Sequence, residues 1–212
     1  MARAEADRVA PPGPLTYEEF LAWCDEDTWA EWVDGRIVMM TPVGDRHQDL
    51  ARFLIGIVDV FVQWRNLGVV RFAPFQMKTG PALPGREPDI FFLSRERMRI
   101  LRPTFLDGPA DLVIEIASPE SRLRDRGEKF AEYEAGGVRE YWIIDPDARR
   151  ADFFRLDGEG RYQRILPGAD GIYRSEVLPG FWLRTEWLWQ EHLPPTLDVL
   201  RELGVIPGLP PR

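Results

Sequence analysis

Three short apolar runs narrow the folds that are open to this chain. They occupy residues 89–93 (DIFFL), 112–117 (LVIEIA) and 140–145 (EYWIID). Runs that are apolar at nearly every position are typical of buried strands, because a strand with one wet face alternates apolar and polar residues. The run at 112–117 is the clearest case of a strand buried on both faces. We therefore expect a sheet with helices packed on it.

Helix signals occur in three other segments. Residues 16–19 (TYEE) form a capping box, which predicts a short helix near the N-terminus. Apolar residues recur at three- and four-residue steps over 50–64, which predicts a long amphipathic helix that stops at Gly68. A further helix is predicted to open at 125–128 (DRGE) and to end at the glycine pair 136–137.

The remaining segments carry strand and turn signals. Residues 32–40 are predicted to form a hairpin around the turn Asp34-Gly35. Residues 69–77 are typical of one strand and 81–87 of a loop, while the looser alternation over 151–174 suggests antiparallel strands at a sheet edge. This order indicates an α/β fold, with a mixed sheet flanked by helices and additional antiparallel edge strands.

Length and composition favour one globular domain. The chain has 212 residues, and we place a single domain at 15–203, between a flexible N-terminal segment, 1–14, and a flexible C-terminal tail, 204–212. The lone cysteine, Cys24, excludes an internal disulfide framework. We find neither a signal-peptide pattern nor an apolar stretch long enough to span a bilayer. The protein is therefore expected in the cytoplasm, away from membranes.

Charge limits the classes of function. The formal net charge of −8 argues against a dedicated nucleic-acid coat protein, because such proteins gain affinity by neutralising phosphates. It does not exclude an enzyme that handles nucleic acid through metal ions bound to carboxylates. Four arginines follow the first apolar run and could contact phosphate or form a solvated face: Arg95, Arg97, Arg99 and Arg102.

Two acidic residues lie within the apolar runs. Asp89 begins the first run, and Glu115 stands in the middle of the second. An ionised carboxylate with apolar neighbours is costly to bury unless an arginine, a proton or a metal cation meets it. Pairing with an arginine is the ordinary structural explanation for either residue alone. Asp89 can also lie at the first position of its strand, near water, and need no partner.

Taken together, the two carboxylates suggest a metal site. They belong to strands that we expect to be neighbours, and two carboxylate oxygens are a minimal ligand set for Mg²⁺. That ion keeps several waters and leaves room for a substrate phosphate. A cation between Asp89 and Glu115 could polarise a phosphate and lower the pKa of a bound water, which would make a nucleophile near neutral pH.

A lysine follows the second acidic strand. Only Lys78 and Lys129 among the 27 basic residues are lysine. Because a helix has about 3.6 residues per turn, Lys129 shares a stripe with Tyr133 and Gly136. An ammonium that reaches from this helix toward Glu115 could orient the attacking water and offset transition-state charge. The alternative is a surface lysine that pairs with a carboxylate four residues earlier in the chain.

These residues carry a resemblance to a known family. The chain resembles the PD-(D/E)XK nuclease superfamily, and specifically the Uma-two family of putative restriction endonucleases, from about Leu15 to about Trp182. The resemblance implies a restriction-endonuclease-like core with the active site on a mixed sheet. Six segments carry it: Pro88-Asp89, 111–119 (DLVIEIASP), 124–129 (RDRGEK), 137–146 (GVREYWIIDP), 31–35 (EWVDG) and Arg46-His47.

The resemblance also implies roles for particular residues. It implies Asp89 and Glu115 as ligands of Mg²⁺, with Mn²⁺ as a substitute. The superfamily pattern expects a lysine two residues after the glutamate, where this chain has Ala117. The resemblance is to members whose lysine has moved to the following helix, which makes Lys129 the matching catalytic residue. Glu31 matches a position near the site and could be an extra metal or water ligand, or a solvated strand residue.

Other polar residues are weaker candidates. Gln76 and Lys78 alternate to one face of a predicted strand and could line the cleft. His47 is placed at the start of the long helix, where we interpret it as a polar first-turn residue and not as a catalyst.

The main hypothesis is therefore a Mg²⁺-dependent endonuclease that hydrolyses DNA phosphodiester bonds with a metal-activated water. The alternative is a catalytically inactive module on the nuclease fold that binds DNA or a protein partner, because a fold alone does not establish activity. A third reading is a structural protein whose acidic strand residues pair with arginines. Since many nucleases of this type cut as homodimers, a second copy of the chain is a candidate partner.

Overall fold

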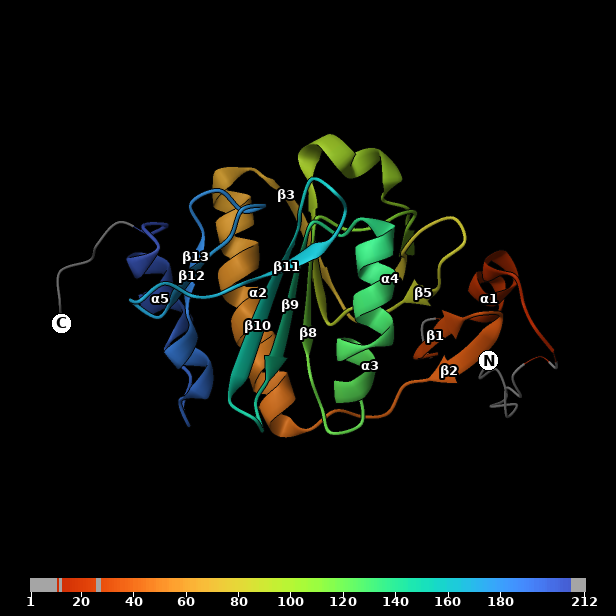
Figure 1. The fold of residues 1–212 in the computed structure, drawn as a ribbon, viewed down its shortest axis with the longest axis horizontal. Coiled ribbons are helices and arrows are strands. Elements are labelled where there is room, and N and C mark those ends of the chain that lie inside the picture. The colour runs from red at the N-terminus through yellow and green to blue at the C-terminus, as the bar shows by residue number, and fades with distance from the viewer. Residues whose placement is uncertain (1–10, 12, 26–27, 207–212) are drawn as a thin grey trace, which may run out of the picture.

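A six-stranded mixed sheet forms the centre of the protein (Figure 1). The computed structural model describes residues 11, 13–25 and 28–206. The strand order is β11-β10-β9-β8-β6-β3, and only β8 and β9 are parallel neighbours. The strands, in chain order, are β3 (Gly68–Phe72), β6 (Ile90–Ser94), β8 (Leu112–Ile116), β9 (Glu140–Asp145), β10 (Arg150–Leu156) and β11 (Tyr162–Ile165).

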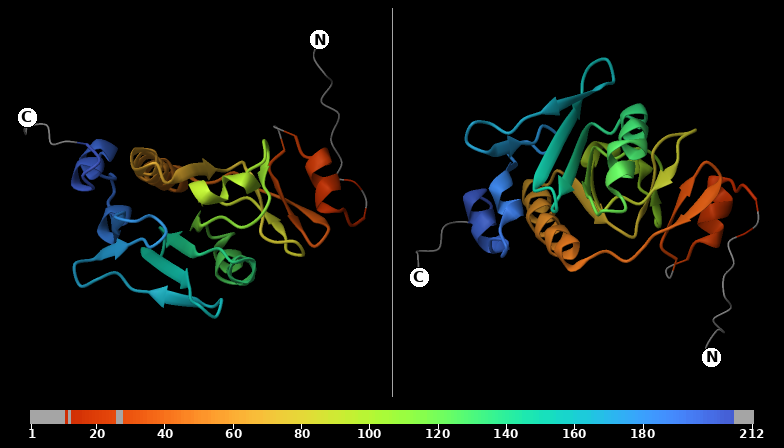
Figure 2. Two further views of the ribbon diagram at one scale, coloured as in Figure 1. Left: turned by 90° about the horizontal axis from the view of Figure 1, so that it is seen from above. Right: turned by 60° about the horizontal axis from the view of Figure 1, so that its bottom comes forward.

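The three apolar runs form three adjacent strands of this sheet, β6, β8 and β9, as the sequence predicts. Helices cover both faces (Figure 2). The long helix α2 (Asp45–Arg65) packs on one face, and α3 (Arg122–Arg126) and α4 (Glu128–Gly136) lie on the other. Along β8, Ile114 and Ile116 join the core under α2, while Val113 joins the core under α4. This two-sided burial explains why the strands lack polar alternation.

A second, five-stranded sheet lies at one end of the protein, next to α1 (Tyr17–Trp23) (Figure 1). The predicted capping box of α1 is present, and the predicted hairpin forms around Asp34 and Gly35, whose φ angles of 48° and 80° suit a tight turn. The strand order is β2-β1-β5-β4-β7. These strands are β1 (Ala30–Val33), β2 (Arg36–Met39), β4 (Gln76–Lys78), β5 (Gly85–Arg86) and β7 (Phe105–Leu106).

The C-terminal part packs beside α2. The helix α5 (Thr196–Glu202) buries Val199 and Leu200 in the core that α2 shares with the sheet. The approach is close, because a Cβ at Gly56 of α2 would lie 3.2 Å from the Thr196 methyl. The other elements are the hairpin of β12 (Ile172–Arg174) and β13 (Trp182–Arg184), and two 3-10 helices, η1 (Arg95–Ile100) and η2 (Thr185–Trp189).

Two predicted strand regions are wrong in detail. The single strand expected at 69–77 is divided between β3 and β4, which belong to different sheets, and Pro74 lies in the break. A proline has no N–H to donate to a strand ladder, which explains the division. The loop expected at 81–87 contains the short strand β5, and β12 pairs with β13 instead of the central sheet edge.

Helix boundaries differ from the prediction at two places. The long helix ends at Asn66 in a left-handed conformation, and Gly68 already belongs to β3, where a Cβ would meet the Leu93 carbonyl oxygen at 2.0 Å. The helix expected to open at residue 125 is two helices, α3 and α4, separated at Gly127. Asp125 is therefore inside α3, where its carboxylate accepts a 2.7 Å hydrogen bond from Ser121.

Two further expectations concern the domain limits and membrane-spanning helices. The flexible ends predicted at 1–14 and 204–212 lie mostly outside the described residues, so the domain limits stay a prediction. Within the part of the chain that the structure describes, no helix combines the length and apolar character that crossing a bilayer would require.

Candidate active site

The candidate site lies at the end of the β6–β8 ladder, where the two strands stop pairing. Their ladder has its last pair at Ile90 and Ile114, and one further step would set Asp89 opposite Glu115. Instead of a backbone pair at this step, the Ile116 N–H donates to Oδ2 of Asp89 at 2.7 Å. The two acidic residues are thus neighbours at the end of the shared ladder, as the sequence predicts for their strands.

Glu115 points toward α4. It alternates along β8 with Ile114 and Ile116, which face α2, and it is 3% exposed. Its Oε1 accepts hydrogen bonds from Lys129 Nζ at 2.9 Å and from the Tyr133 hydroxyl at 2.8 Å. The predicted stripe of Lys129 and Tyr133 on one helix face is therefore present and meets the acidic strand.

Lys129 is a buried cation among three carboxylates. Its Nζ lies 2.9 Å from Glu115, 3.3 Å from Glu31 and 3.8 Å from Asp125. Burial alone would lower the pKa of Lys129, but the charges of these three carboxylates raise it, so the ammonium stays charged at neutral pH. The alternative of a surface lysine paired with Asp125 is wrong, because the side chain is 2% exposed and Asp125 is its most distant partner of the three.

Asp89 is held by a histidine and a backbone amide. His47 Nε2 lies 3.2 Å from Oδ2 of Asp89, the same oxygen that accepts from Ile116. His47 is in the first turn of α2, as expected, but its contact with Asp89 is more than a first-turn role. Among the described residues, neither Asp89 nor Glu115 forms an ion pair with an arginine. Arginine pairing therefore explains neither the buried Glu115 nor the partly exposed Asp89.

Glu31 is fully buried, and its reading as a solvated strand residue is wrong. Its Oε2 accepts from Arg86 at 3.0 Å, and its Oε1 accepts from the Glu87 N–H at 3.2 Å and lies near Lys129. Arg86 also forms two hydrogen bonds with Glu132 of α4. Burial would raise the pKa of Glu31, but Lys129 and Arg86 lower it. Glu31 therefore joins β1 to β5 and α4.

Gln76 and Lys78 lie farther from the two carboxylates. Gln76 is buried, and its Nε2 donates to Ala30 at 2.6 Å and to Glu87 at 3.0 Å. Gln76 thus borders the site through Glu87. Lys78 lies 5.1 Å from the Tyr17 ring centroid and 3.9 Å from Glu18, so it belongs to the α1 region.

Sequence reasoning gave no role in the site to four polar residues that lie here. Tyr133 and His47 contact the two carboxylates, Asp125 approaches Lys129, and Glu87 is 4% exposed. Burial, together with the charge of Glu31, raises the pKa of Glu87 to about 8, against the opposing effect of Gln76. The helical stripe could have indicated Tyr133, whereas the contact of His47 depends on how α2 docks on the sheet.

The site carries more negative than positive charge. Glu31, Glu115 and Asp125 surround the ammonium of Lys129, and Arg86 is shared between Glu31 and Glu132. Burial and the charges of Asp89 and Asp125 raise the pKa of Glu115 to about 8, although Lys129 opposes the shift. Burial also raises the pKa of Asp125. Among the described residues, no three His, Cys, Asp or Glu side chains form a ready-made metal centre.

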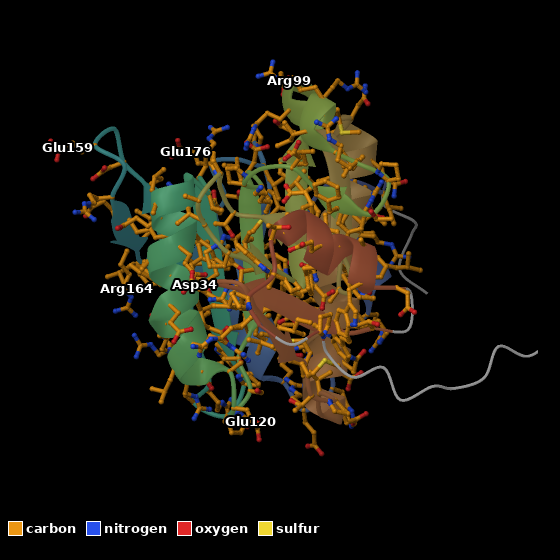
Figure 3. All side chains as sticks on the ribbon, turned by 90° about the vertical axis from the view of Figure 1, so that its right-hand side faces the viewer. Asp34, Arg99, Glu120, Glu159, Arg164 and Glu176 are labelled. Carbon is orange, nitrogen blue, oxygen red and sulfur yellow. The ribbon has the colours of Figure 1, made fainter. Side chains whose placement is uncertain are left out.

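A cavity of about 620 Å³ opens beside Asp89. Its polar lining includes Asp89, His47 and Arg52, and its walls are otherwise largely apolar, with Trp29 and Phe72 among them. The arginines of η1 are not part of this cavity. In Figure 3, Arg99 lies at the opposite end of the protein from Glu120, which follows β8. The arginines of η1 therefore do not contribute to the surroundings of Asp89.

Comparison with known proteins identifies a family and a similar fold. The model of the Uma2 (Uma-two) family, described as a putative restriction endonuclease, matches residues 17–186. Among solved structures, the crystal structure of a putative nuclease belonging to DUF820 from Anabaena variabilis is similar, with a TM-score of 0.69 and 16% identity over 83% of this chain and 98% of that chain. At this identity the likeness shows a shared fold. No curated protein matches the chain.

Proposed function

Because the chain belongs to the Uma2 family of putative restriction endonucleases, we propose that it is a Mg²⁺-dependent endonuclease that hydrolyses DNA phosphodiester bonds. Family membership supports the general statement that the chain is a nuclease. The dependence on Mg²⁺, the choice of DNA and the hydrolytic mechanism are our proposal. One observation carries it: Asp89 and Glu115 lie at neighbouring positions at the end of the β6–β8 ladder, and Glu115 contacts a buried lysine.

The donor set suits a hard divalent cation. One oxygen of each carboxylate is already occupied, because Oδ2 of Asp89 and Oε1 of Glu115 each accept two hydrogen bonds. The other oxygens, Oδ1 and Oε2, accept none from the described residues. Two carboxylate oxygens with room for waters and substrate fit Mg²⁺, and Mn²⁺ is a reasonable substitute.

The electrostatics also suit a cation. The pKa of Glu115 is raised to about 8, chiefly by burial, which favours a proton on this carboxyl, whereas the charge of Lys129 opposes the shift. Metal ligands must be deprotonated, and a divalent ion bound by Asp89 and Glu115 would take the place of that proton. When bound, Mg²⁺ supplies Lewis acidity to the scissile phosphate and lowers the pKa of a water ligand.

Lys129 would stabilise the reaction beside the metal ion. Lys129 presents a fixed positive charge at the site, where it can orient the attacking water and offset the charge that develops on the phosphate. Its burial and its three carboxylate neighbours hold the ammonium in place before substrate arrives. Preorganised charges of this kind stabilise a transition state without reorganisation during the reaction.

A plasmid-nicking assay tests the proposal. Wild type, Glu115→Gln and Lys129→Met are incubated with supercoiled DNA and Mg²⁺ or Mn²⁺, with Lys78→Met as the matched lysine control. We expect nicking by wild type and Lys78→Met, and a loss of about 100-fold or more in the two site variants. Equal nicking by all four proteins, or none by wild type with either metal, would contradict the proposal.

The second candidate function is a non-catalytic module on the same fold. The contacts of Lys129 with three carboxylates favour it, because they would also serve as a purely structural ion network. Titration calorimetry with Mn²⁺ separates the two functions. A catalytic site binds the ion and loses it in Asp89→Asn, whereas a structural network gives no binding heat in either protein.

A further inference from the structure

We propose that His47 and Tyr133 are positioning residues, each of which holds one oxygen of a site carboxylate so that its other oxygen is presented to the cation. His47 acts on Asp89 from α2, and Tyr133 acts on Glu115 from α4. The inference rests on the proposed function, because it assigns these residues a role in the metal site. The proposed function does not by itself require this role, since a metal could bind the two carboxylates even if no other residue held them in place.

His47 has the geometry for this role. Its Nε2 lies 3.2 Å from Oδ2 of Asp89, and a carboxylate oxygen can only accept, so the contact requires the hydrogen to be on Nε2. The ring is 9% exposed, and Nδ1 is buried and has no hydrogen-bond partner among the described residues. Within the described part of the protein, Asp89 is thus the one hydrogen-bond partner of the ring.

The Ile116 amide completes the restraint on Asp89. It donates to the same Oδ2 at 2.7 Å from β8. Two donors from different elements, one from the helix and one from the strand, fix the rotation of the carboxylate about its last torsion. Oδ1 is then the oxygen left for a ligand.

Tyr133 restrains Glu115 in a corresponding way. Its hydroxyl donates to Oε1 at 2.8 Å, alongside Lys129. The Tyr133 ring is fully buried and packs edge-on against Tyr141, with ring centroids 5.0 Å apart, which fixes the direction of the hydroxyl. Burial and the charge of Glu115 raise the pKa of Tyr133, so the hydroxyl remains a donor.

Residues in such positions affect metal affinity without touching the metal. Outer partners that orient ligating groups typically contribute about 10- to 100-fold to affinity. His47 and Tyr133 belong to helices on opposite faces of the sheet and hydrogen-bond to different carboxylates, so their effects should be nearly additive.

The test measures the Mn²⁺ dissociation constant by titration calorimetry on the full chain. Tyr133→Phe removes one hydroxyl and keeps the ring, and His47→Ala removes the ring donor. We expect each to weaken Mn²⁺ binding by about 10- to 100-fold. His47→Gln should recover most of the loss, because the amide nitrogen of glutamine can replace Nε2 as a donor.

Matched controls make the same chemical changes elsewhere. Tyr162→Phe removes a buried hydroxyl that donates to the Val138 carbonyl at 2.8 Å, and His192→Gln changes the other, exposed histidine. Both should bind Mn²⁺ as wild type does. Thermal unfolding without metal shows whether each variant is folded, and if His47→Ala is not, His47→Gln and Tyr133→Phe still carry the test.

The outcomes separate this inference from the proposed function. If Tyr133→Phe and His47→Ala bind Mn²⁺ like wild type while Asp89→Asn does not bind, the positioning role is overturned and the metal site stands. If His47→Gln is as weak as His47→Ala, the hydrogen bond is not what His47 contributes, and its positioning role is overturned. If wild type binds no Mn²⁺, both the inference and the metal site are overturned.

Discussion

Lys129 and Glu115 are joined by a 2.9 Å contact between Nζ and Oε1, although they belong to different elements and are 14 residues apart. The superfamily pattern that the chain resembles expects the lysine at the position of Ala117, on the same strand as the glutamate. Here α4 supplies the ammonium to the same carboxylate from above the sheet. The charge of the site is therefore assembled from a strand and a helix.

Replacing Lys129 should cost stability as well as activity. Lys129→Met leaves Glu115, Glu31 and Asp125 without their shared buried cation, and removing one partner of a buried ion pair costs about 3–5 kcal/mol. Urea unfolding at pH 7 measures the change in the free energy of unfolding. The control Lys78→Met, at a partly exposed lysine, should change it by less than about 1 kcal/mol. Equal effects of the two substitutions would contradict the network described here.

Stabilisation by Mg²⁺ should grow with pH. The folded-state pKa of Glu115, about 8, lies above its usual 4.5, so the folded protein binds this proton more tightly than the unfolded chain. In chelator, its contribution to stability is complete below pH 4.5 and is lost as the pH rises through about 8. Mg²⁺ competes with the proton and should therefore raise the melting temperature more at pH 8.5 than at pH 6, by the arithmetic of ligand linkage.

Differential scanning fluorimetry across this pH range, with Mg²⁺ or chelator, measures the effect. Glu115→Gln cannot titrate and should remove most of the pH dependence of the Mg²⁺ shift. A shift that is the same at pH 6 and pH 8.5 would show that Glu115 does not exchange its proton for the metal.

Arg86 should be a major contributor to stability. It is 1% exposed and pairs with Glu31 of β1 and Glu132 of α4, so Arg86→Met removes a buried cation that two carboxylates share. We expect a loss of about 3–5 kcal/mol in the free energy of unfolding, measured in urea. Arg36→Met, at an exposed position of the neighbouring hairpin, is the matched control and should be nearly neutral. A comparable loss in both variants would mean that burial of the ion network is not the cause.

Gly68 should tolerate no side chain. A Cβ there would lie 2.0 Å from the Leu93 carbonyl oxygen, which belongs to the backbone of the adjacent strand β6. Gly68→Ala should therefore destabilise the protein by at least about 1–3 kcal/mol, because β3 has to move away from β6. Gly158→Ala adds the same methyl group where nothing lies within 4 Å, and should have little effect on thermal unfolding. A neutral Gly68→Ala would show that β3 can move without cost.

The central sheet could be predicted because its strands carry their signal locally. The runs in β6, β8 and β9 are apolar at almost every position, and the stripe of Lys129 and Tyr133 follows from helical periodicity alone. The second sheet could not be predicted in the same way. Its strands β5 and β7 have only two residues each, which is too short for periodicity to appear, and they are held by pairing with distant segments.

The candidate site could be predicted only in part, because many of its contacts join residues that are distant in the sequence. The sequence indicates that Asp89 and Glu115 need partners, but the structure alone identifies those partners as His47, Tyr133 and backbone amides. The burial of Glu31 depends on Arg86, which is 55 residues away in the chain. No local pattern marks such a pair, because the two residues meet only when β1, β5 and α4 come together. The roles of Asp89, Glu115 and Lys129 in metal binding and catalysis stay predictions.

The ammonium of Lys129 comes from α4, and not from the strand that carries Glu115. This separation decides which substitutions affect the core and which affect the charge of the site. Residue 117 is a small alanine, 1% exposed, and it belongs to the same buried core as Met77, Val113 and Tyr141. The core around residue 117 and the buried ammonium thus come from separate pieces of chain. Substitutions around Ala117 alter packing and leave every charged group in place, whereas loosening the first turn of α4 withdraws the positive charge and leaves the strands paired.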